Sequence, residues 1–437
     1  MRFKITNFKK NIMNSKLIRE LQTLIENEVI SIEVAEKIEA YYNSKSPNQS
    51  NKLLTIFGVI GSLLVGLGII LVLAHNWDNF SRTIKSVLAF LPLLIGQIIV
   101  GYSLLKKKTK TWLESSGVFL FFAVGSSISL ISQIYNIPGN FSSFLLTWFL
   151  LCVPLVYLLK SKVLFLLTLV FATVYSVDVG YNFSGIRKVP WMYLLTIAIL
   201  LPKYLMLLKD EVVMNYTAIL NWLIPLSAII VFGAFINSSF MFELILYILL
   251  FGLLYNIGLL KKFNKIRLIK NGFLIIGSMG LVITLLLASS KSFWHKDLDI
   301  YNLQIKEIII GFVLILSTVF IMPKNNFFNN KGYQKLFQLT SIIMLFIFII
   351  HYLDITIAII LLNFTLLALG ITTIKKGVDT INFTLLNYGF LIITALIITR
   401  FFDTNMSFVV RGLLFILVGV GFFSTNYLLA KKIKKDA

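Results

Sequence analysis

The chain has 437 residues, of which 58% are hydrophobic and only 14% are charged. Soluble domains carry about 25% charged residues, so this composition excludes an ordinary soluble protein and indicates an integral membrane protein. The formal net charge is +21, but the lysines and arginines lie in short clusters between apolar runs, which is the pattern that sets membrane topology. No dense basic face with interleaved aromatic residues is left for nucleic acid, so we expect no nucleic-acid partner.

The chain contains one cysteine, Cys152, which lies within an apolar run. A single thiol excludes an intrachain disulfide and a zinc site built from thiolates. The first fifty residues contain no uninterrupted apolar segment of the kind found in a cleavable signal peptide. We therefore expect the first apolar run itself to direct insertion into the membrane.

Residues 1–52 form the one substantial polar segment, and they predict a cytoplasmic helical hairpin followed by a linker. Ser15 and Ser31 can each cap a helix with an apolar stripe, and residues 43–52 have the composition of a linker. Residues 1–12 continue no helical stripe, so we expect them to be dispensable or disordered, or translation to start at Met13. The hairpin is too small to hold a core alone. It is expected to pack on the membrane domain or on a cytoplasmic protein partner.

From Leu53 to residue 430 the chain consists of apolar runs separated by short polar breaks. A bilayer core needs about 20 apolar residues per helix. We expect about fourteen transmembrane helices, at 53–74, 86–105, 115–135, 142–159, 163–181, 189–207, 215–236, 242–260, 271–290, 308–323, 336–353, 355–374, 380–400 and 407–430. The break at Asp354 leaves almost no loop. One helix over 336–374 would be roughly 58 Å long, about twice the thickness of the core, which favours two helices in a tight hairpin.

The distribution of basic residues supports an even number of spans. Of the 40 lysines and arginines, 22 fall in the loops and tail assigned to the inner side, against eight in the outer loops. An error of one span would invert every later loop and remove this bias. We therefore expect an all-α membrane bundle with both termini in the cytoplasm. Its parts would be the hairpin and linker at 1–52, the transmembrane domain at 53–430 and a basic tail at 431–437.

The segments around the first and third spans are similar to a known family. The residues that carry the similarity are Gly66, Gly68, Ala74, Asn76, Trp77, Asp78 and Arg82, then Leu130–Tyr135, Gly139, Trp148 and Pro154. Over about residues 16–162 the chain resembles the bacterial membrane proteins grouped as domain of unknown function 2157, although His75 replaces their usual small residue. The ending, from Arg400 to Gly412 with a basic tail, also resembles full-length members. The resemblance implies a polytopic protein of the bacterial inner membrane. It does not indicate an activity.

Acidic residues beside the apolar runs are the most informative polar feature. Five of them fall at outer ends of predicted spans, namely Asp78, Asp178, Glu243, Asp354 and Asp403. Ionisable groups at membrane depth indicate function by default, although each could instead be a solvated interfacial residue. Arginines lie near Asp78 and Asp403 in sequence, so these two are expected to be paired and structural. The other three have no basic residue nearby in sequence and are candidates for reversible protonation or cation binding.

Polar residues of the third span complete the expected site. Ser126, Ser129 and Gln133 share one helical face, and Gln133 is equally suited to interhelical bonding and to lining a cavity. The predicted outer polar site comprises Asn76, Trp77, Asp78, Arg82, Gln133, Tyr135, Asp178, Glu243, Asp354, Arg400, Asp403 and Arg411. We expect at least one of Asp178, Glu243 and Asp354 to line a polar cavity together with Gln133 or Tyr135. In the first span, Gly58, Ser62 and Gly66 form a stripe typical of close helix packing.

No motif in the sequence indicates a particular reaction. The chain has no phosphate-binding glycine loop, no nucleophile elbow and no histidine pair with metal-binding spacing, so we expect no catalytic residue, cofactor or metal. Three functions stay open: a carrier or flippase-like transporter, a scaffold that binds a cytoplasmic partner through residues 1–52, and a lipid-linked transferase that uses Asp78. The last would need larger outer loops than the longest one, at about 291–307. The pattern does not specify the substrate, whether a small molecule or a lipid.

Overall fold

A computed structural model of the chain describes residues 15–45, 77–181, 187–210, 214–263, 266–294, 304–325, 327, 332–403 and 408–436. These residues form helices and short connections, and no strand is assigned among them. The predicted all-α membrane bundle is confirmed. Residues 1–12, the first predicted span and its stripe of small residues lie outside the described part. The chain divides into two compact units, Met1–Val87 and Leu88–Ala437, which are described separately.

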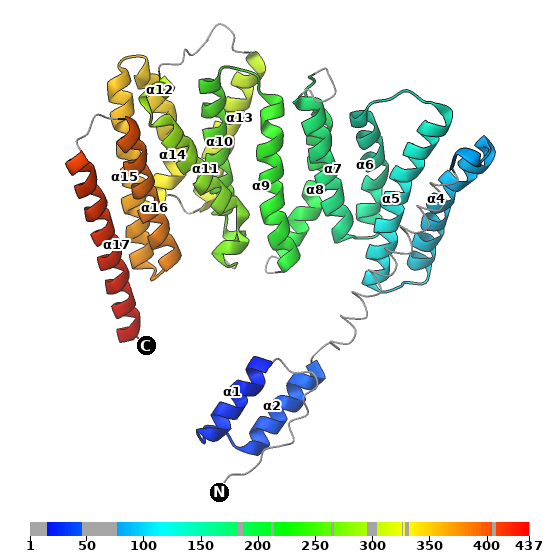
Figure 1. Ribbon diagram of the computed structural model, residues 1–437, viewed down its shortest axis with the longest axis horizontal. Coiled ribbons are helices and arrows are strands. Elements are labelled where there is room, and N and C mark those ends of the chain that lie inside the picture. The colour runs from blue at the N-terminus through cyan, green and yellow to red at the C-terminus, as the bar shows by residue number, and fades with distance from the viewer. Residues whose placement is uncertain are drawn as a thin grey trace. The chain divides into compact units, whose positions relative to one another are not determined.

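The first unit contains the predicted hairpin, formed by α1 (Ser15–Glu26) and α2 (Ile32–Lys45) (Figure 1). The Ser31 hydroxyl accepts a hydrogen bond from the backbone N–H of Val34 at 3.4 Å, as expected of a helix cap. Leu21 and Ala35 are buried between the two helices. The short helix η1 (Trp77–Asn79) and the start of α4 also belong to this unit.

Each of the other thirteen predicted spans contains a helix. They are α4 (Arg82–Leu105), α5 (Lys110–Tyr135), α6 (Phe141–Leu158), α7 (Lys162–Gly180), α8 (Trp191–Asp210), α9 (Asn215–Phe235), α10 (Phe240–Gly258), α11 (Gly272–Ala288), α13 (Ile305–Ile321), α14 (Gly332–His351), α15 (Ile355–Asp379), α16 (Phe383–Asp403) and α17 (Phe408–Asp436). Ten of the described helices are long and apolar enough to cross a bilayer, and three more have shorter apolar stretches. A total of fourteen spans therefore stays a prediction. The tail predicted at 431–437 continues α17 as far as Asp436.

The predicted helix break at Asp354 is confirmed. Helix α14 ends at His351 and α15 begins at Ile355. The Asp354 carboxylate accepts hydrogen bonds from the backbone N–H groups of Thr356 at 2.6 Å and Ile357 at 3.2 Å, so it caps α15. A capping aspartate satisfies N–H groups that have no partner inside the helix. The chain can therefore turn back within three residues, and the two helices pack together.

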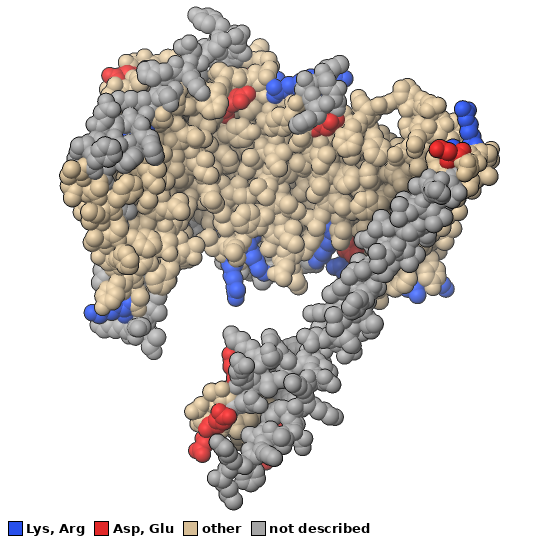
Figure 2. Space-filling view, in the orientation of Figure 1, with Lys and Arg blue, Asp and Glu red and all other residues tan. Residues whose placement is uncertain are grey.

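Short connections make successive helices of the second unit run in opposite directions (Figure 1). The connections therefore lie alternately at the two ends of the helices, and most charged residues lie on or near them. We call one the basic end. It carries the α4–α5, α6–α7 and α10–α11 connections, with lysines at 106, 107, 108, 160, 162, 261, 262 and 270. The opposite end carries the α5–α6, α7–α8 and α9–α10 connections and holds both signs of charge, so we call it the mixed-charge end. Figure 2 shows mainly blue side chains along the lower edge and both colours along the upper edge.

Helix α10 lies at the centre of the core and packs against α9, α11, α13 and α14. Its contact with α11 depends on a small residue, since a Cβ atom at Gly277 would lie 2.4 Å from the backbone nitrogen of Tyr255. Small residues at such crossings let two backbones approach closely, and this is a main source of packing energy in a bilayer.

Buried amide side chains hold the helix ends together at the basic end. Asn256 donates hydrogen bonds to the carbonyl of Gly252 at 2.9 Å and to that of Gln338 at 3.2 Å. Asn325 donates to the carbonyl of Asn256 at 2.7 Å, and Asn271 donates to that of Gly258 at 2.8 Å. Backbone carbonyls at helix ends need such partners wherever water is excluded.

Glu114 of α5 caps the N-terminus of α7. Its carboxylate accepts hydrogen bonds from the backbone N–H groups of Lys162 at 2.8 Å and Val163 at 3.2 Å, and from the Ser161 hydroxyl. The Ser161 hydroxyl in turn accepts the N–H of Leu164 at 3.1 Å. A negative charge at a helix N-terminus also interacts favourably with the helix dipole. One side chain therefore fastens α7 to α5.

Candidate functional site

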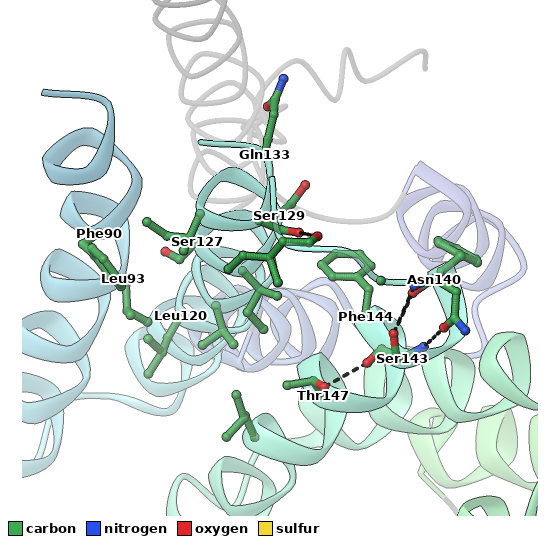
Figure 3. A pocket seen from close by; sticks show the side chains of 18 of the residues that line it. Phe90, Leu93, Leu120, Ser127, Ser129, Gln133, Asn140, Ser143, Phe144 and Thr147 are labelled. Carbon is green, nitrogen blue, oxygen red and sulfur yellow. Dashed lines mark hydrogen bonds between the residues drawn. The ribbon is translucent and has the colours of Figure 1, made fainter. Parts of the chain in front are cut away.

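The first three helices of the second unit enclose a pocket of about 1080 Å³, which we call the α4–α6 pocket (Figure 3). Helix α4 contributes Phe90, Leu93 and Gln97; α5 contributes Leu120, Val124, Ser127, Ile128, Ser129, Ile131, Ser132 and Gln133; the connection contributes Ile137, Pro138, Gly139 and Asn140; and α6 contributes Phe141, Ser143, Phe144, Thr147, Leu151 and Leu155. A volume of this size accommodates a molecule much larger than an ion.

Two contacts hold α5 in place as the central wall of this pocket. Trp148 of α6 lies against Gly125, where an added Cβ atom would be 2.2 Å from the indole ring, and its Nε1 donates to the carbonyl of Phe121 at 2.7 Å. On the other side, the buried Ser127 hydroxyl donates to the carbonyl of Ala89 in α4 at 2.7 Å. Helix α5 is therefore fixed to both neighbouring helices.

The polar lining of the pocket lies toward the mixed-charge end. Asn140 and Ser143 form a capping box at the start of α6, in which the Asn140 side chain accepts the N–H of Ser143 at 2.8 Å. The Thr147 hydroxyl donates to the carbonyl of Ser143 at 2.8 Å. Ser129 and Gln133 of α5 are exposed. The Gln133 amide makes no hydrogen bond to any other described side chain or backbone group, so it can interact with a molecule in the pocket.

Away from that end the lining is mainly apolar, with Gln97 of α4 as an exposed polar exception. Along α6 it passes from Asn140 and Thr147 to Leu151 and Leu155, and along α5 the apolar Leu120 lies farthest from the mixed-charge end. A polar group could therefore bind near the helix ends while an apolar chain lies along the helices. Sites of this kind use a few placed polar groups to orient a mainly apolar ligand.

Residues 22–165 match the family model described as "Predicted membrane protein (DUF2157)". We call these residues the DUF2157 segment. This match confirms the resemblance inferred from the first and third spans, whereas the resembling ending from Arg400 onward lies outside the matched residues. Every residue that lines the α4–α6 pocket falls within the DUF2157 segment. No curated protein and no solved structure shows a significant match to the chain.

Of the predicted site residues whose side chains the structure describes, Gln133 alone lines this pocket. Tyr135 is 53% exposed and is not part of the lining. The described lining contains none of Asp178, Glu243 and Asp354, nor any other carboxylate. In this pocket Gln133 therefore shares a cavity with none of the three acids. All three acids lie after residue 165, where the DUF2157 segment ends.

These three acids have different surroundings. Asp178 is buried in α7, with 9% of its surface exposed. Glu243, in the first turn of α10, is half-buried and accepts the backbone N–H of Ser238 at 3.3 Å. Asp354 is exposed and caps α15. For Glu243 and Asp354, the hydrogen bonds from backbone N–H groups indicate a structural role.

Glu243 lies near a cation that its sequence neighbours did not indicate, because Arg187 donates to the side chain of Asn237 and Glu243 accepts the N–H of the next residue, Ser238. The hydroxyls of Tyr181 and Tyr247 converge on Gly233, where an added Cβ atom would lie 2.3 and 2.8 Å from them. Arg187 and Glu243 therefore lie at the same α9–α10 connection, which weakens the case for Glu243 as an isolated acid.

The first predicted pair, Asp78 and Arg82, lies in the first unit, and both side chains are exposed. No ion pair joins these two described residues. The ring of Trp77 instead lies 5.7 Å from the Lys85 ammonium group. Asn76 falls outside the described residues. The expected pairing of Asp78 stays a prediction.

The second predicted group is partly described. The Arg400 guanidinium, at the end of α16, donates to the carbonyl of Ser289 and to its hydroxyl at 3.3 Å. It thereby joins α16 to the end of α11. The side chains of Asp403 and Arg411 fall outside the described part, so their predicted pairing with Arg400 is untested.

The sequence did not single out a network at the mixed-charge end. Glu307 of α13 is fully buried and accepts the backbone N–H of Asn237 at 2.7 Å. Arg187 donates to the Asn237 side chain at 2.6 Å and to the carbonyl of Gly233 at 3.1 Å. The spacing of Gln304 and Glu307, which form a capping box, is the one local signal that could have identified it. The network fixes the α9–α10 connection.

Within the described residues, no group of three histidine, cysteine, aspartate or glutamate side chains is arranged to hold a metal ion. His351 packs against the ring of Trp294 at a centroid distance of 4.7 Å. The other two histidines, His75 and His295, fall outside the described part.

Proposed function

We propose that this membrane protein is a carrier or flippase-like transporter of amphipathic, lipid-like molecules, and that the α4–α6 pocket is its binding site. The observation that carries the proposal is the graded lining of that pocket. Exposed polar side chains such as Gln133 lie at one end, and leucines continue along the helices. A polar amide near the membrane normally finds a partner in a neighbouring helix. Its exposure here favours a ligand that brings its own polar group.

The proposal places the polar end of the pocket on the outer side of a bacterial inner membrane. The lysine-rich basic end would then face the cytoplasm, together with both termini, because basic loops are retained on that side. The α5–α6 connection, next to Gln133, would face outward. An amphipathic molecule could enter this half of the bundle from the outer leaflet.

Thiol labelling tests this orientation. Cys152 is buried and is the only cysteine, so a Cys152→Ala background removes native labelling. In that background, Lys188→Cys should react with a membrane-impermeant maleimide in intact cells, and Lys106→Cys should react only after permeabilisation. Both lysines are exposed, on connections at opposite ends of the bundle. The reverse pattern would place the polar end of the pocket in the cytoplasm.

The proposed transport is tested with the purified full chain in phospholipid vesicles that contain a trace of lipid with a fluorescent head group. A membrane-impermeant reductant destroys the probe in the outer leaflet only. We expect the protected inner-leaflet probe to become accessible about tenfold faster than in protein-free vesicles. The assay is run without a gradient and with proton or sodium gradients. Equal rates in protein-containing and protein-free vesicles under all three conditions would contradict the proposal.

A specific observation keeps the scaffold as a second candidate. In the α1–α2 hairpin, Val29 and Ile32 are 64% and 58% exposed, and Leu24 and Val34 are exposed as well. Clustered apolar surface of this kind is typical of protein interaction sites. Deleting residues 1–52 separates the two functions. A transporter should keep its lipid exchange after the deletion, whereas a scaffold should show no exchange even as the full chain.

A further inference from the structure

A second cavity, of about 270 Å³, lies at the basic end among α10, α11, α14, α15 and α16, outside the DUF2157 segment. Tyr255 and Phe337 form part of its wall with their rings stacked at 5.3 Å. Leu391 of α16 also lines it and is 60% exposed. The cavity therefore reaches the apolar outer surface of the bundle, which faces lipid in a membrane protein.

Among the described residues that line this cavity, a lysine side chain supplies the one charge. Lys376 of α15 is half-buried, and no aspartate or glutamate lines the cavity with it. Its ammonium group makes no hydrogen bond or ion pair with the residues that the structure describes. The hydroxyl of Tyr388 is also buried there, close to Ser278, and no hydrogen bond of good geometry satisfies it among those residues.

A cation in apolar surroundings is costly unless an anion or several hydrogen bonds compensate its lost hydration. The hydroxyls of Thr372 and Thr373 donate to carbonyls of their own helix at 2.7 and 2.6 Å, and neither accepts a hydrogen bond from the Lys376 ammonium group. Lysine is a common partner of phosphate groups in proteins. The remaining walls are mainly leucine, isoleucine and aromatic side chains, which suit an acyl chain.

We propose that this cavity binds the phosphate group of an amphipathic anion through Lys376 and the Tyr388 hydroxyl, and that an anionic phospholipid supplies it. The opening beside Leu391 admits the acyl chain from the surrounding bilayer. This site is independent of the proposed transport, because it shares no residue and no helix with the α4–α6 pocket.

Native mass spectrometry of the purified full chain measures this binding, with phosphatidylglycerol as the probe and phosphatidylcholine as the zwitterionic comparison. Lys376→Met should weaken phosphatidylglycerol binding about tenfold. Lys375→Met is the matched control, since Lys375 is adjacent and exposed and does not line the cavity; it should bind within about twofold of wild type. Equal binding by the two methionine variants, or equal binding of both lipids by the wild type, would overturn the proposal.

Two conservative variants distinguish a loss of lipid binding from a loss of folding. Lys376→Arg keeps the charge and should retain most of the binding, and Tyr388→Phe removes only the hydroxyl and should weaken it about threefold. Unchanged binding by Tyr388→Phe together with loss by Lys376→Arg would indicate a packing role and overturn the assignment. Inorganic phosphate is added as a competitor. If inorganic phosphate does not displace the lipid, the result supports a phospholipid as the ligand. Displacement at equal concentration would assign the cavity to a soluble anion and overturn the lipid assignment.

Discussion

Replacing Glu114 by alanine should lower the free energy of unfolding by about 3 kcal/mol, as expected when several charge-assisted hydrogen bonds to a helix N-terminus are lost together. The substitution leaves the N–H groups of Lys162 and Val163 without their acceptor. Few alternatives exist at this site, because α7 begins directly after a short connection and its first turn is partly buried. The measurement is a denaturant titration of the purified protein in mixed micelles.

Two control substitutions distinguish the loss of this helix cap from the general effect of removing a negative charge. Glu114→Gln keeps one oxygen acceptor and should lose about 1 kcal/mol, since a neutral acceptor binds N–H groups more weakly. Asp379→Ala removes an exposed carboxylate at the basic end and should change stability by less than about 0.5 kcal/mol. A loss for Glu114→Ala no larger than that for Asp379→Ala would show that the cap contributes little.

The helices could be predicted because a bilayer leaves the chain few choices. Every backbone polar group in hydrocarbon must be satisfied internally, so a run of about 20 apolar residues becomes a helix. The same reasoning found the break at Asp354, where one helix would have been too long for the membrane. Periodicity also found the hairpin before the membrane domain, with Leu21 and Ala35 buried between its helices.

The roles of the acidic residues could not be predicted, since their partners are backbone groups. Asp354 and Glu243 were candidates for protonation because no basic residue lies near them in sequence. In the fold, Asp354 caps a helix and Glu243 accepts the N–H of Ser238. Glu114 and Glu307 perform the same kind of task across 48 and 70 residues of chain. Neither composition nor spacing reports contacts between such distant segments.

The serines of α5 show the same limit on a finer scale. Ser126, Ser127 and Ser129 look alike in sequence, but the rotation of the helix gives each a different role. Ser127 donates to a carbonyl of α4, and Ser126 donates to the carbonyl of Ala123 in its own helix. Ser129 is exposed in the α4–α6 pocket. Whether a serine lines the pocket, as Ser127 and Ser129 do and Ser126 does not, is decided by the packing of α5 against α4 and α6, where Trp148 fits against Gly125.

Because Ser129 lines the pocket and Ser126 does not, a matched pair of substitutions at these positions can test the transport proposal. Ser129→Phe places a large side chain inside the α4–α6 pocket, where it would occupy space that the ligand needs. Ser126→Phe makes the same chemical change three residues away, on an exposed surface that does not line the pocket. Both variants should fold, because neither wild-type side chain bonds to another helix. Equal melting temperatures, and equal elution volumes in size-exclusion chromatography, would establish that both variants are folded.

The decisive measurement is the rate of lipid exchange for Ser129→Phe relative to Ser126→Phe, in vesicles with equal amounts of protein. If the α4–α6 pocket carries the substrate, Ser129→Phe should slow exchange at least about tenfold, a change of about 1.4 kcal/mol in the barrier. Ser126→Phe should stay within about twofold of wild type. Equal exchange by the two folded variants would contradict a substrate path through this pocket.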